Sequence, residues 1–331
     1  GGANGYIRLN GFSPDLSATS LEVKIPELNL TLNNIPVKSD GALDFHLKNK
    51  ILAIDNFTLL APHSRIKLSG QSEIKEPSDP GLDFLLTGEL SLEDINPMLS
   101  GMSAGGKTEF QASLKGSLQQ PLIDGRVDLN QVFFRLSDLP LVVSGVQGRL
   151  TIDNSRLQLE KVNGEANSGR FTASGQADFG PSFSLPEARL NFVLEDFDFN
   201  YPPGLNSLSR ASLTLTKSKT GWLLAGDLFI INASYLEDFY PSTQGLKMIF
   251  SRVSPAGSEM SPFLYELALN INVRTIDNIV IKNNLADLEL KANLNIKGTV
   301  PTPVLSGRAE NAYTGEIIIG ERKYTVERLR V

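Results

Sequence analysis

Two short motifs of enzyme active sites overlap at residues 101–108, GMSAGGKT. The whole segment matches the phosphate-binding pattern GxxxxGK(S/T), and its first half matches the nucleophile pattern GxSxG, with Ser103 as nucleophile. Both chemistries need a strand before the motif and a helix after it. Here Pro97 precedes the motif, and residues 110–114 alternate between apolar and polar, which predicts a strand. We therefore expect a flexible turn at 101–108 and neither nucleotide binding nor acyl transfer.

The other candidates for chemistry are two histidines and several carboxylates. His46 occupies a polar position of an alternating run and His63 follows a proline, so we expect both at the surface, without an acid partner. Turns and helix ends should leave the notable carboxylates solvated: Asp94, Glu195, Asp196, Asp198, Glu237 and Asp238. Cysteine is absent, which excludes thiolate metal sites and cysteine nucleophiles. The sequence predicts no enzyme, no metal site and no cofactor.

Composition narrows the class of protein further. The chain has 331 residues, of which 41% are hydrophobic and 21% charged, as in folded proteins. The net charge is −6 and no basic cluster occurs, so nucleic acid is not the expected partner. No run approaches the roughly 18–20 apolar residues that a membrane helix needs. The chain begins with two glycines and ends inside an alternating run, so we expect a fragment of a longer protein.

In the segments that would position these residues, apolar and polar residues alternate with a period of two. Residues 288–296 are apolar at every even position and polar at every odd one, which is typical of a strand with one wet and one dry face. At residues 190–201 the apolar positions change from even to odd, which predicts a β-bulge. Helical periodicity is confined to 91–99 and 233–240. Trp222 should point inward.

We therefore predict an all-β chain with very little helix. Roughly 25 strands should form an antiparallel or meander sheet, as one continuous unit over residues 1–331. The apolar members of the clean alternations should share one face: Leu43, Phe45, Leu150, Ile152, Leu190, Phe192, Leu194, Leu213, Leu215, Leu267, Leu269, Ile271, Val273, Leu288, Leu290, Leu294 and Ile296. Two sheets could cover this face as a sandwich, or one sheet could curl so that the face lines a channel.

Two internal repeats favour an elongated stack of similar units. Residues 114–126 and 296–308 share the order apolar-Lys-Gly, Pro-apolar-apolar and Gly-Arg, at a constant offset of 182. Residues 41–71 and 148–176 share a longer pattern that ends in Ser-Gly-Gln. The first unit should be a strand end, a proline-shaped turn and a new strand.

These repeats, together with the closing stretch GEIIIG…YTV at 315–326, resemble the TamB/AsmA-like family of bacterial envelope proteins, which are bridge-like lipid transfer proteins. The resemblance implies a U-shaped trough with an apolar interior, in the periplasm, within a full-length protein anchored in the inner membrane. It implies phospholipid acyl chains as cargo between the inner and outer membranes, and an outer-membrane barrel of the TamA type as partner. Under this resemblance we expect the anchor and the family's usual C-terminal end to lie outside the given sequence.

Three functions follow as hypotheses. The first is lipid transport along an apolar groove lined by the residues named above. The second is a scaffold or chaperone that offers sheet edges, such as residues 324–331, to strands of an outer-membrane barrel or autotransporter. The third, a glycan-active enzyme, would need clustered inward carboxylates, and the sequence shows no convincing cluster.

Overall fold

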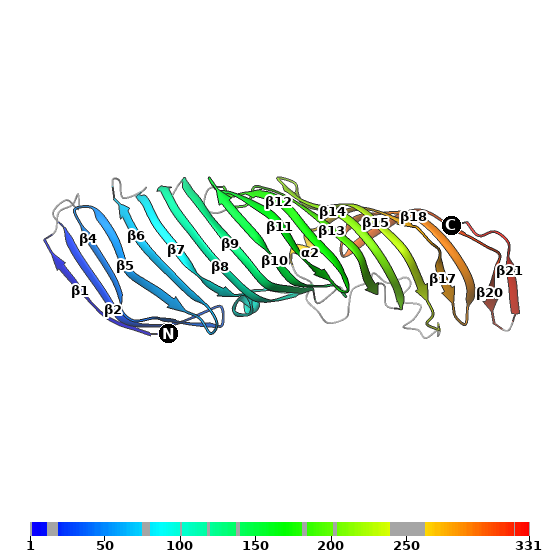
Figure 1. Cartoon of the computed structure of the whole chain (residues 1–331), viewed down its shortest axis with the longest axis horizontal. Helices are drawn as coiled ribbons and strands as arrows, with labels where there is room; N and C mark the ends of the chain where they lie inside the picture. The colour runs from blue at the N-terminus through cyan, green and yellow to red at the C-terminus, as the bar shows by residue number, and fades with distance from the viewer. Residues whose placement is uncertain are drawn as a thin grey trace.

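The computed structural model describes residues 2–11, 19–74, 80–99, 101–117, 120–136, 140–180, 184–200, 204–238, 262–320 and 322–330. These residues form one elongated sheet of 21 strands, and Figure 1 shows the strands following one another along the long axis. The all-β prediction is confirmed, although the described strands are fewer than the roughly 25 expected from turn spacing.

The strands are β1 (Gly2–Asn10), β2 (Ser20–Leu32), β3 (Ile35–Ser39), β4 (Leu43–Lys48), β5 (Ile51–Leu60), β6 (Arg65–Glu73), β7 (Gly81–Ser91), β8 (Met102–Ser117), β9 (Pro121–Leu136), β10 (Val142–Asp153), β11 (Arg156–Ala166), β12 (Gly169–Asp178), β13 (Glu187–Asn200), β14 (Leu205–Ser218), β15 (Gly221–Tyr235), β16 (Ala268–Thr275), β17 (Ile279–Lys282), β18 (Ala286–Thr299), β19 (Thr302–Asn311), β20 (Gly315–Ile319) and β21 (Arg322–Val326).

Most neighbours along the chain are antiparallel neighbours in the sheet, from β4 through β15 without interruption. The exception is β15, which pairs in parallel with β16 and with β17. A parallel pair needs a long crossover, and residues 236–267 separate these strands. The prediction of an antiparallel meander is therefore wrong at this one step.

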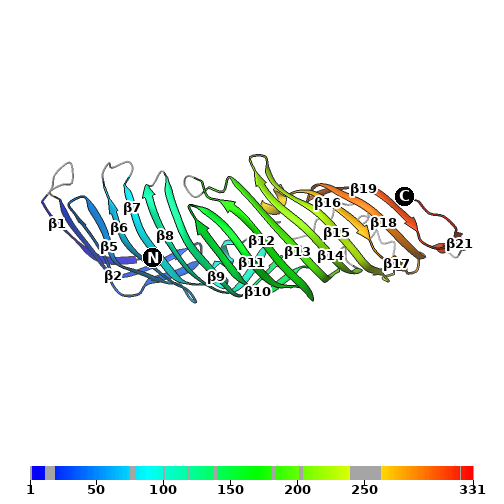
Figure 2. The ribbon, with the colours of Figure 1, turned by 45° about the horizontal axis from the view of Figure 1, so that its top comes forward.

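Bulges bend the strands in the middle of the sheet. The register shifts in β9, β10, β11 and β13, where the extra residues Gln131, Gly145, Lys161 and Asp196 have φ of 52, 59, 47 and 52°. The bulge in β13 lies between Leu194 and Phe197, which confirms the predicted change of phase. Because a bulge bends its strand and increases the twist, these insertions curve the ribbon, and Figure 2 shows the strands crossing the long axis obliquely.

Glycines supply a second source of curvature. Gly70, Gly175, Gly226 and Gly307 have φ between 132 and 147°, a region that other residues rarely adopt. A Cβ at Gly175 would lie 2.2 Å from the carbonyl oxygen of Arg189 on the neighbouring strand. Glycine kinks of this kind let a sheet curl without a clash between strands.

The described residues contain two short helices. The 3₁₀ helix η1 (Leu92–Met98) lies within the predicted 91–99 helix. The second predicted helix, 233–240, is wrong for residues 233–238, because 233–235 belong to β15 and 236–238 form neither helix nor strand. Residues 239–240 lie outside the described part of the chain. The short helix α2 (Pro262–Glu266) was not predicted.

Candidate functional site

Pairing between strands arranges apolar side chains in rows across the sheet. Directly paired residues of neighbouring strands lie on the same face. One row runs through Leu150, Leu159, Gly175, Leu190, Leu215, Leu224 and Leu269. A second runs through Val162, Ala173, Phe192, Leu213, Gly226, Ile271, Ile296 and Leu305. We call the side of the sheet that carries these rows the apolar face.

Of the residues predicted to share one face, all except Leu267 lie in strands, and the register places them on the apolar face. Leu267 directly precedes β16 and is buried. The predicted set omits several others that the register places on the same face: Leu68, Phe84, Phe110, Leu159, Phe171, Phe197 and Leu228. A glycine or a bulge interrupts the alternation beside Leu68, Phe197 and Leu228, whereas the alternating run at 110–114 predicts a strand but not which face its apolar side chains share.

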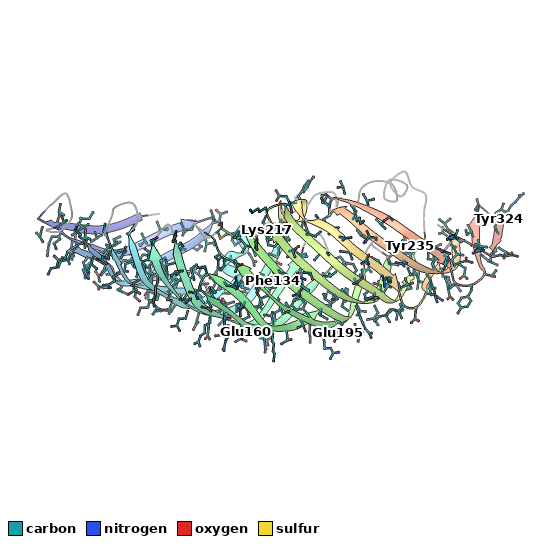
Figure 3. All side chains as sticks on the ribbon, turned by 90° about the horizontal axis from the view of Figure 1, so that it is seen from above. Phe134, Glu160, Glu195, Lys217, Tyr235 and Tyr324 are labelled. Atoms are coloured by element: carbon teal, nitrogen blue, oxygen red, sulfur yellow. The ribbon has the colours of Figure 1, made fainter. Side chains whose placement is uncertain are left out.

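The opposite face is polar and carries ion pairs between neighbouring strands. Arg149 Nε lies 2.6 Å from Asp128, and Arg170 lies 2.7 Å from Glu195. The hydrogen bond and charge of Asp128 raise the pKa of Arg149. Figure 3 shows Glu160 and Glu195 pointing away from the ribbon on this side, whereas Phe134 lies on the other side. Most charged side chains of the strands therefore lie on the polar face.

Near the bulges the apolar face is fully buried. Ala104, Val132, Val146 and Val162 form one cluster with relative exposures of 0 to 4%, and Leu92 of η1 joins them. Small side chains suit this region because bent strands bring their inner side chains together. Farther along the strands, the leucines and phenylalanines of the rows are mostly only half-buried. The helix η1 thus covers one part of a longer apolar surface.

Total surface area shows how open the molecule is. The accessible surface is 20005 Å² for 36.0 kDa, whereas a compact monomer of that mass has about 13,000 Å². A second layer packed against the sheet would remove much of this excess. Apart from strands and their connections, the described residues contain only the helices η1 and α2, which are both short. A covering second sheet is therefore absent from the described part of the chain.

The motif at 101–108 forms no phosphate or nucleophile site. Met102 begins β8, so most of the motif is a strand rather than the turn we predicted, and no helix follows it. The strand starts early because it pairs with β9, with Ala104 opposite Phe134. Ser103 lies within this pairing, opposite Arg135.

Both histidines are exposed as predicted, but the expectation that they lack acid partners is wrong. His46 Nδ1 lies 2.7 Å from Asp55, and His63 Nδ1 lies 3.0 Å from Asp94. Ser64 Oγ donates to the same carboxylate and not to the imidazole, so no activated nucleophile forms. The His46 contact crosses the turn between β4 and β5, and the His63 contact joins residues 31 positions apart in the chain. The alternation of apolar and polar residues does not reveal contacts of either kind.

Asp94 is buried rather than solvated, contrary to the sequence prediction. Burial raises the pKa of Asp94, but hydrogen bonds from Ser64 and from the backbone and side chain of His63 outweigh it, and the pKa lies below its ordinary value. The carboxylate thereby fixes η1 to the turn before β6. The remaining notable carboxylates are exposed or half-buried.

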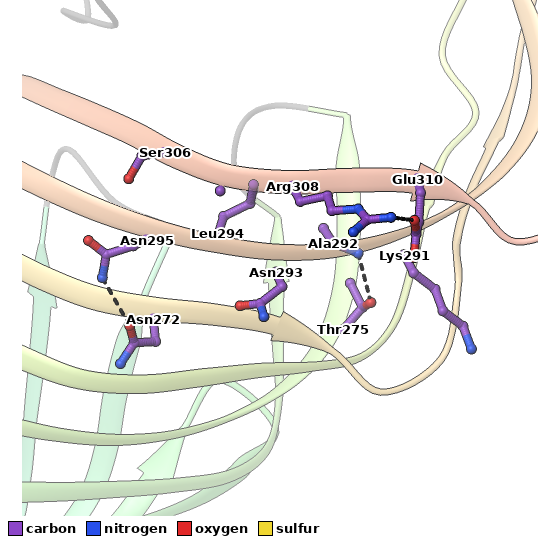
Figure 4. A pocket seen from close by; sticks show the side chains of 11 residues that line it. Asn272, Thr275, Lys291, Ala292, Asn293, Leu294, Asn295, Ser306, Arg308 and Glu310 are labelled. Atoms are coloured by element: carbon purple, nitrogen blue, oxygen red, sulfur yellow. Dashed lines mark hydrogen bonds and ion pairs between the residues drawn. The ribbon is translucent and has the colours of Figure 1, made fainter. Parts of the chain in front are cut away.

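A polar hollow of about 590 Å³ lies between β16, β18 and β19 (Figure 4). Asn295 Nδ2 donates to the side-chain oxygen of Asn272 at 2.9 Å, and Arg308 pairs with Glu310 at 2.5 Å. Its side chains therefore largely satisfy one another. Within the described residues, no group of three or more His, Cys, Asp or Glu side chains is placed to hold a metal ion.

A family model described as the TamB C-terminal domain matches residues 156–315. Through this segment the chain belongs to the TamB C-terminal domain family. The TamB match runs from the first residue of β11 to the first residue of β20, and so includes the parallel step and many residues of the apolar rows. No curated protein and no solved structure matches the chain.

The TamB family has a role in the cell envelope, is typically periplasmic and generally works with TamA. It is a non-enzymatic family. In the part of the chain that the structure describes, no helix is long and apolar enough to cross a membrane.

Proposed function

We propose that this chain is a periplasmic segment of a bridge-like protein that carries phospholipid between the inner and outer membranes along a U-shaped apolar groove. The observation that carries the proposal is the continuity of the apolar face. Its rows extend from β4 to β19 without a charged side chain until the strand ends.

The direction of bending supports a groove. The extra residues of the bulges lie on the polar side; Asp196, for example, pairs with Arg210 there. Added backbone lengthens that side, so the strands should curl around the apolar face. Glycines on the apolar face, such as Gly175 and Gly226, leave room between the strands and the groove axis.

Energetics also favour acyl chains as cargo. Burying a chain of about 16 carbons would contribute on the order of 13 kcal/mol before entropy costs. Contacts of this kind have no preferred direction, so a lipid could slide along the rows without large barriers. The described sheet would provide a path on the order of 80 Å.

A pair of substitutions on adjacent residues of β13 tests the groove. Phe192 lies on the apolar face, whereas Val193 lies on the polar face and is 42% exposed. We expect Phe192→Asp, and likewise Leu290→Asp, to lower the phospholipid captured by the purified chain at least fivefold, because a carboxylate in an acyl path must be desolvated. Val193→Asp is the matched control and should capture as much as the parent. Native mass spectrometry of the intact protein measures the bound lipid, and equal capture by all variants would contradict the groove.

The strand-edge scaffold is a second candidate, favoured by the exposed edge at the C-terminal end of the sheet. Leu305 of β19 is 61% exposed and Tyr324 of β21 is 48% exposed. An edge strand with free backbone groups can pair with a partner strand. A lipid-free chain that still binds unfolded barrel segments would favour this role, with TamA-type barrels as the proposed partners.

A further inference from the structure

The apolar face carries a positive charge at the end of β14. Register places Lys217 on this face, opposite Trp222 of β15. Across the described strands, the pairing assigns only one other charged side chain to the same face, Arg322 at the start of β21. The remaining charged residues of the strands lie on the polar face, where many form ion pairs. Lys217 is therefore an exception that needs a physical reason.

The position of Lys217 is the rim of the apolar face. It belongs to a row that runs through Ile152, Leu157, Ala177 and Ala188 and continues to Trp222. The β14–β15 turn follows one residue later. An ammonium group here can extend from the last apolar row toward water while its stem covers apolar surface. The next residues inward on the same face are Leu215 and Leu224, which are paired with each other.

An aromatic pair lies beside the ammonium group, with Trp222 next to it and Phe263 behind Trp222. Lys217 Nζ lies 5.5 Å from the centre of the Trp222 ring, within the range of a cation–π contact. Phe263 of α2 packs edge-on against Trp222, with ring centroids 5.4 Å apart. Among the ion pairs of the described residues none involves Lys217. The group thus combines one unneutralised cation, one indole and a neighbouring apolar row, and Figure 3 marks Lys217 near the helix.

We propose that Lys217, Trp222 and Phe263 form a head-group site, at which the ammonium binds the phosphate of a phospholipid whose acyl chains lie over Leu215 and Leu224. The assignment rests on the proposed lipid-carrying function and names a place where a moving lipid pauses. Charge complementarity selects the phosphate, and an indole suits the boundary between an apolar and a wet region. The two acyl chains would enter the rows that begin beside the site.

Trp222 is the only tryptophan of the chain, so its fluorescence reports on this site alone. We would add vesicles of phosphatidylethanolamine and phosphatidylglycerol in which the acyl chains carry bromine near the carbonyl end or near the methyl end. Bromine near the carbonyl end should quench Trp222 more strongly, because the site holds the head-group end of the lipid. Stronger quenching by bromine at the methyl end would overturn the assignment.

Substitutions separate the charge from the groove. Lys217→Met keeps the apolar stem, Lys217→Arg keeps the charge, and Lys219→Met removes a charge from the exposed turn two residues later. We expect Lys217→Met to weaken capture of phospholipid about tenfold, while capture of diacylglycerol with the same acyl chains is unchanged. Lys217→Arg and Lys219→Met should behave like the parent, and inorganic phosphate alone should not shift the Trp222 emission.

The outcomes of this experiment are distinguishable from failure of the groove itself. If Lys217→Met captures phospholipid as well as the parent, or loses diacylglycerol equally, the head-group site is wrong although the groove stands. If inorganic phosphate alone shifts the emission, Lys217 binds a free anion and not a lipid. If the parent chain captures neither lipid, the proposed transport function fails first.

Discussion

The two hairpins that share the Lys-Gly, Pro and Gly-Arg pattern have the same turn but different neighbours. In the β8–β9 hairpin Gly116 has φ of 86° and pairs with Pro121; in the β18–β19 hairpin Gly298 has φ of 91° and pairs with Pro303. The repeated residues therefore produce the same local geometry at both places.

Their surroundings differ because β9 is also paired with β10 along most of its length. Within the described residues, the far edge of β19 meets no further strand there. It has only an isolated bridge from Glu310 to Arg330 and the hydrogen bonds of Asn311 to residues 326–329. Ile123 of β9 is half-buried as a result, while its equivalent Leu305 is 61% exposed. A repeated motif thus specifies a turn, and the next strand decides how much its side chains contribute to stability.

The largest expected difference between the hairpins concerns Gly125 and its equivalent Gly307. A Cβ at Gly125 would lie 2.4 Å from the Gln111 carbonyl oxygen, in a strand held on both sides. A Cβ at Gly307 would lie 2.3 Å from the Asn293 carbonyl oxygen, and φ there is 141°, so a side chain is strained at both positions. We expect Gly125→Val to lower the local free energy of opening of β8–β10 by about 3 kcal/mol. Gly307→Val should lower that of β18–β19 by only about 1 kcal/mol, because an edge strand can shift to relieve the clash. Hydrogen exchange of peptides from each hairpin measures both, and equal losses would remove the distinction.

A smaller difference is expected when apolar side chains on the two hairpins are replaced by a carboxylate. Ile123→Asp should destabilise its hairpin by about 2 kcal/mol because it places a charge in an apolar row. Leu305→Asp should change stability by less than about 0.5 kcal/mol, since most of that side chain is already in water. Chemical denaturation monitored by hydrogen exchange compares the two, and a loss at Leu305 as large as at Ile123 would show that the β19 edge is covered.

The smallest expected effect concerns the buried carboxylate that attaches η1 beside β8. The short helix near β18, α2, has only the exposed Glu266 as an acidic side chain. Asp94→Asn should weaken η1 by about 1 kcal/mol at neutral pH. The folded-state pKa of Asp94 lies below its ordinary value, so its carboxylate stabilises the fold above the unfolded pKa. That contribution is lost as the pH falls through the folded pKa.

Exchange of the η1 amides, corrected for the intrinsic pH dependence, should therefore differ between Asp94→Asn and the parent at pH near 7 and converge in acid. Amides of β18 and β19 serve as the internal control and should not respond. A difference that persists in acid would mean that the charge of Asp94 does not hold η1.

The strands and the apolar face were predictable because period two is a local property. Apolar and polar side chains alternate from Leu288 to Ile296 whichever strands lie beside them. The change of phase between Leu194 and Phe197 likewise indicates a bulge from the sequence of one strand alone. Other features join residues that are distant in sequence or depend on the partner strand. They are the parallel pairing of β15, the hydrogen bonds of His63 and Ser64 to Asp94, and the packing of Phe263 against Trp222. Alternation carries no information about such partners.

The sequence by itself determined that this protein is a sheet with one dry and one wet face, because side chains of an extended chain alternate whatever the partner strand. Only the tertiary structure decided which strands meet, that bulges and glycine kinks bend them, and that one lysine stands at the rim of the dry face. Those features depend on register between strands, and register is set by the whole set of neighbours rather than by any one segment.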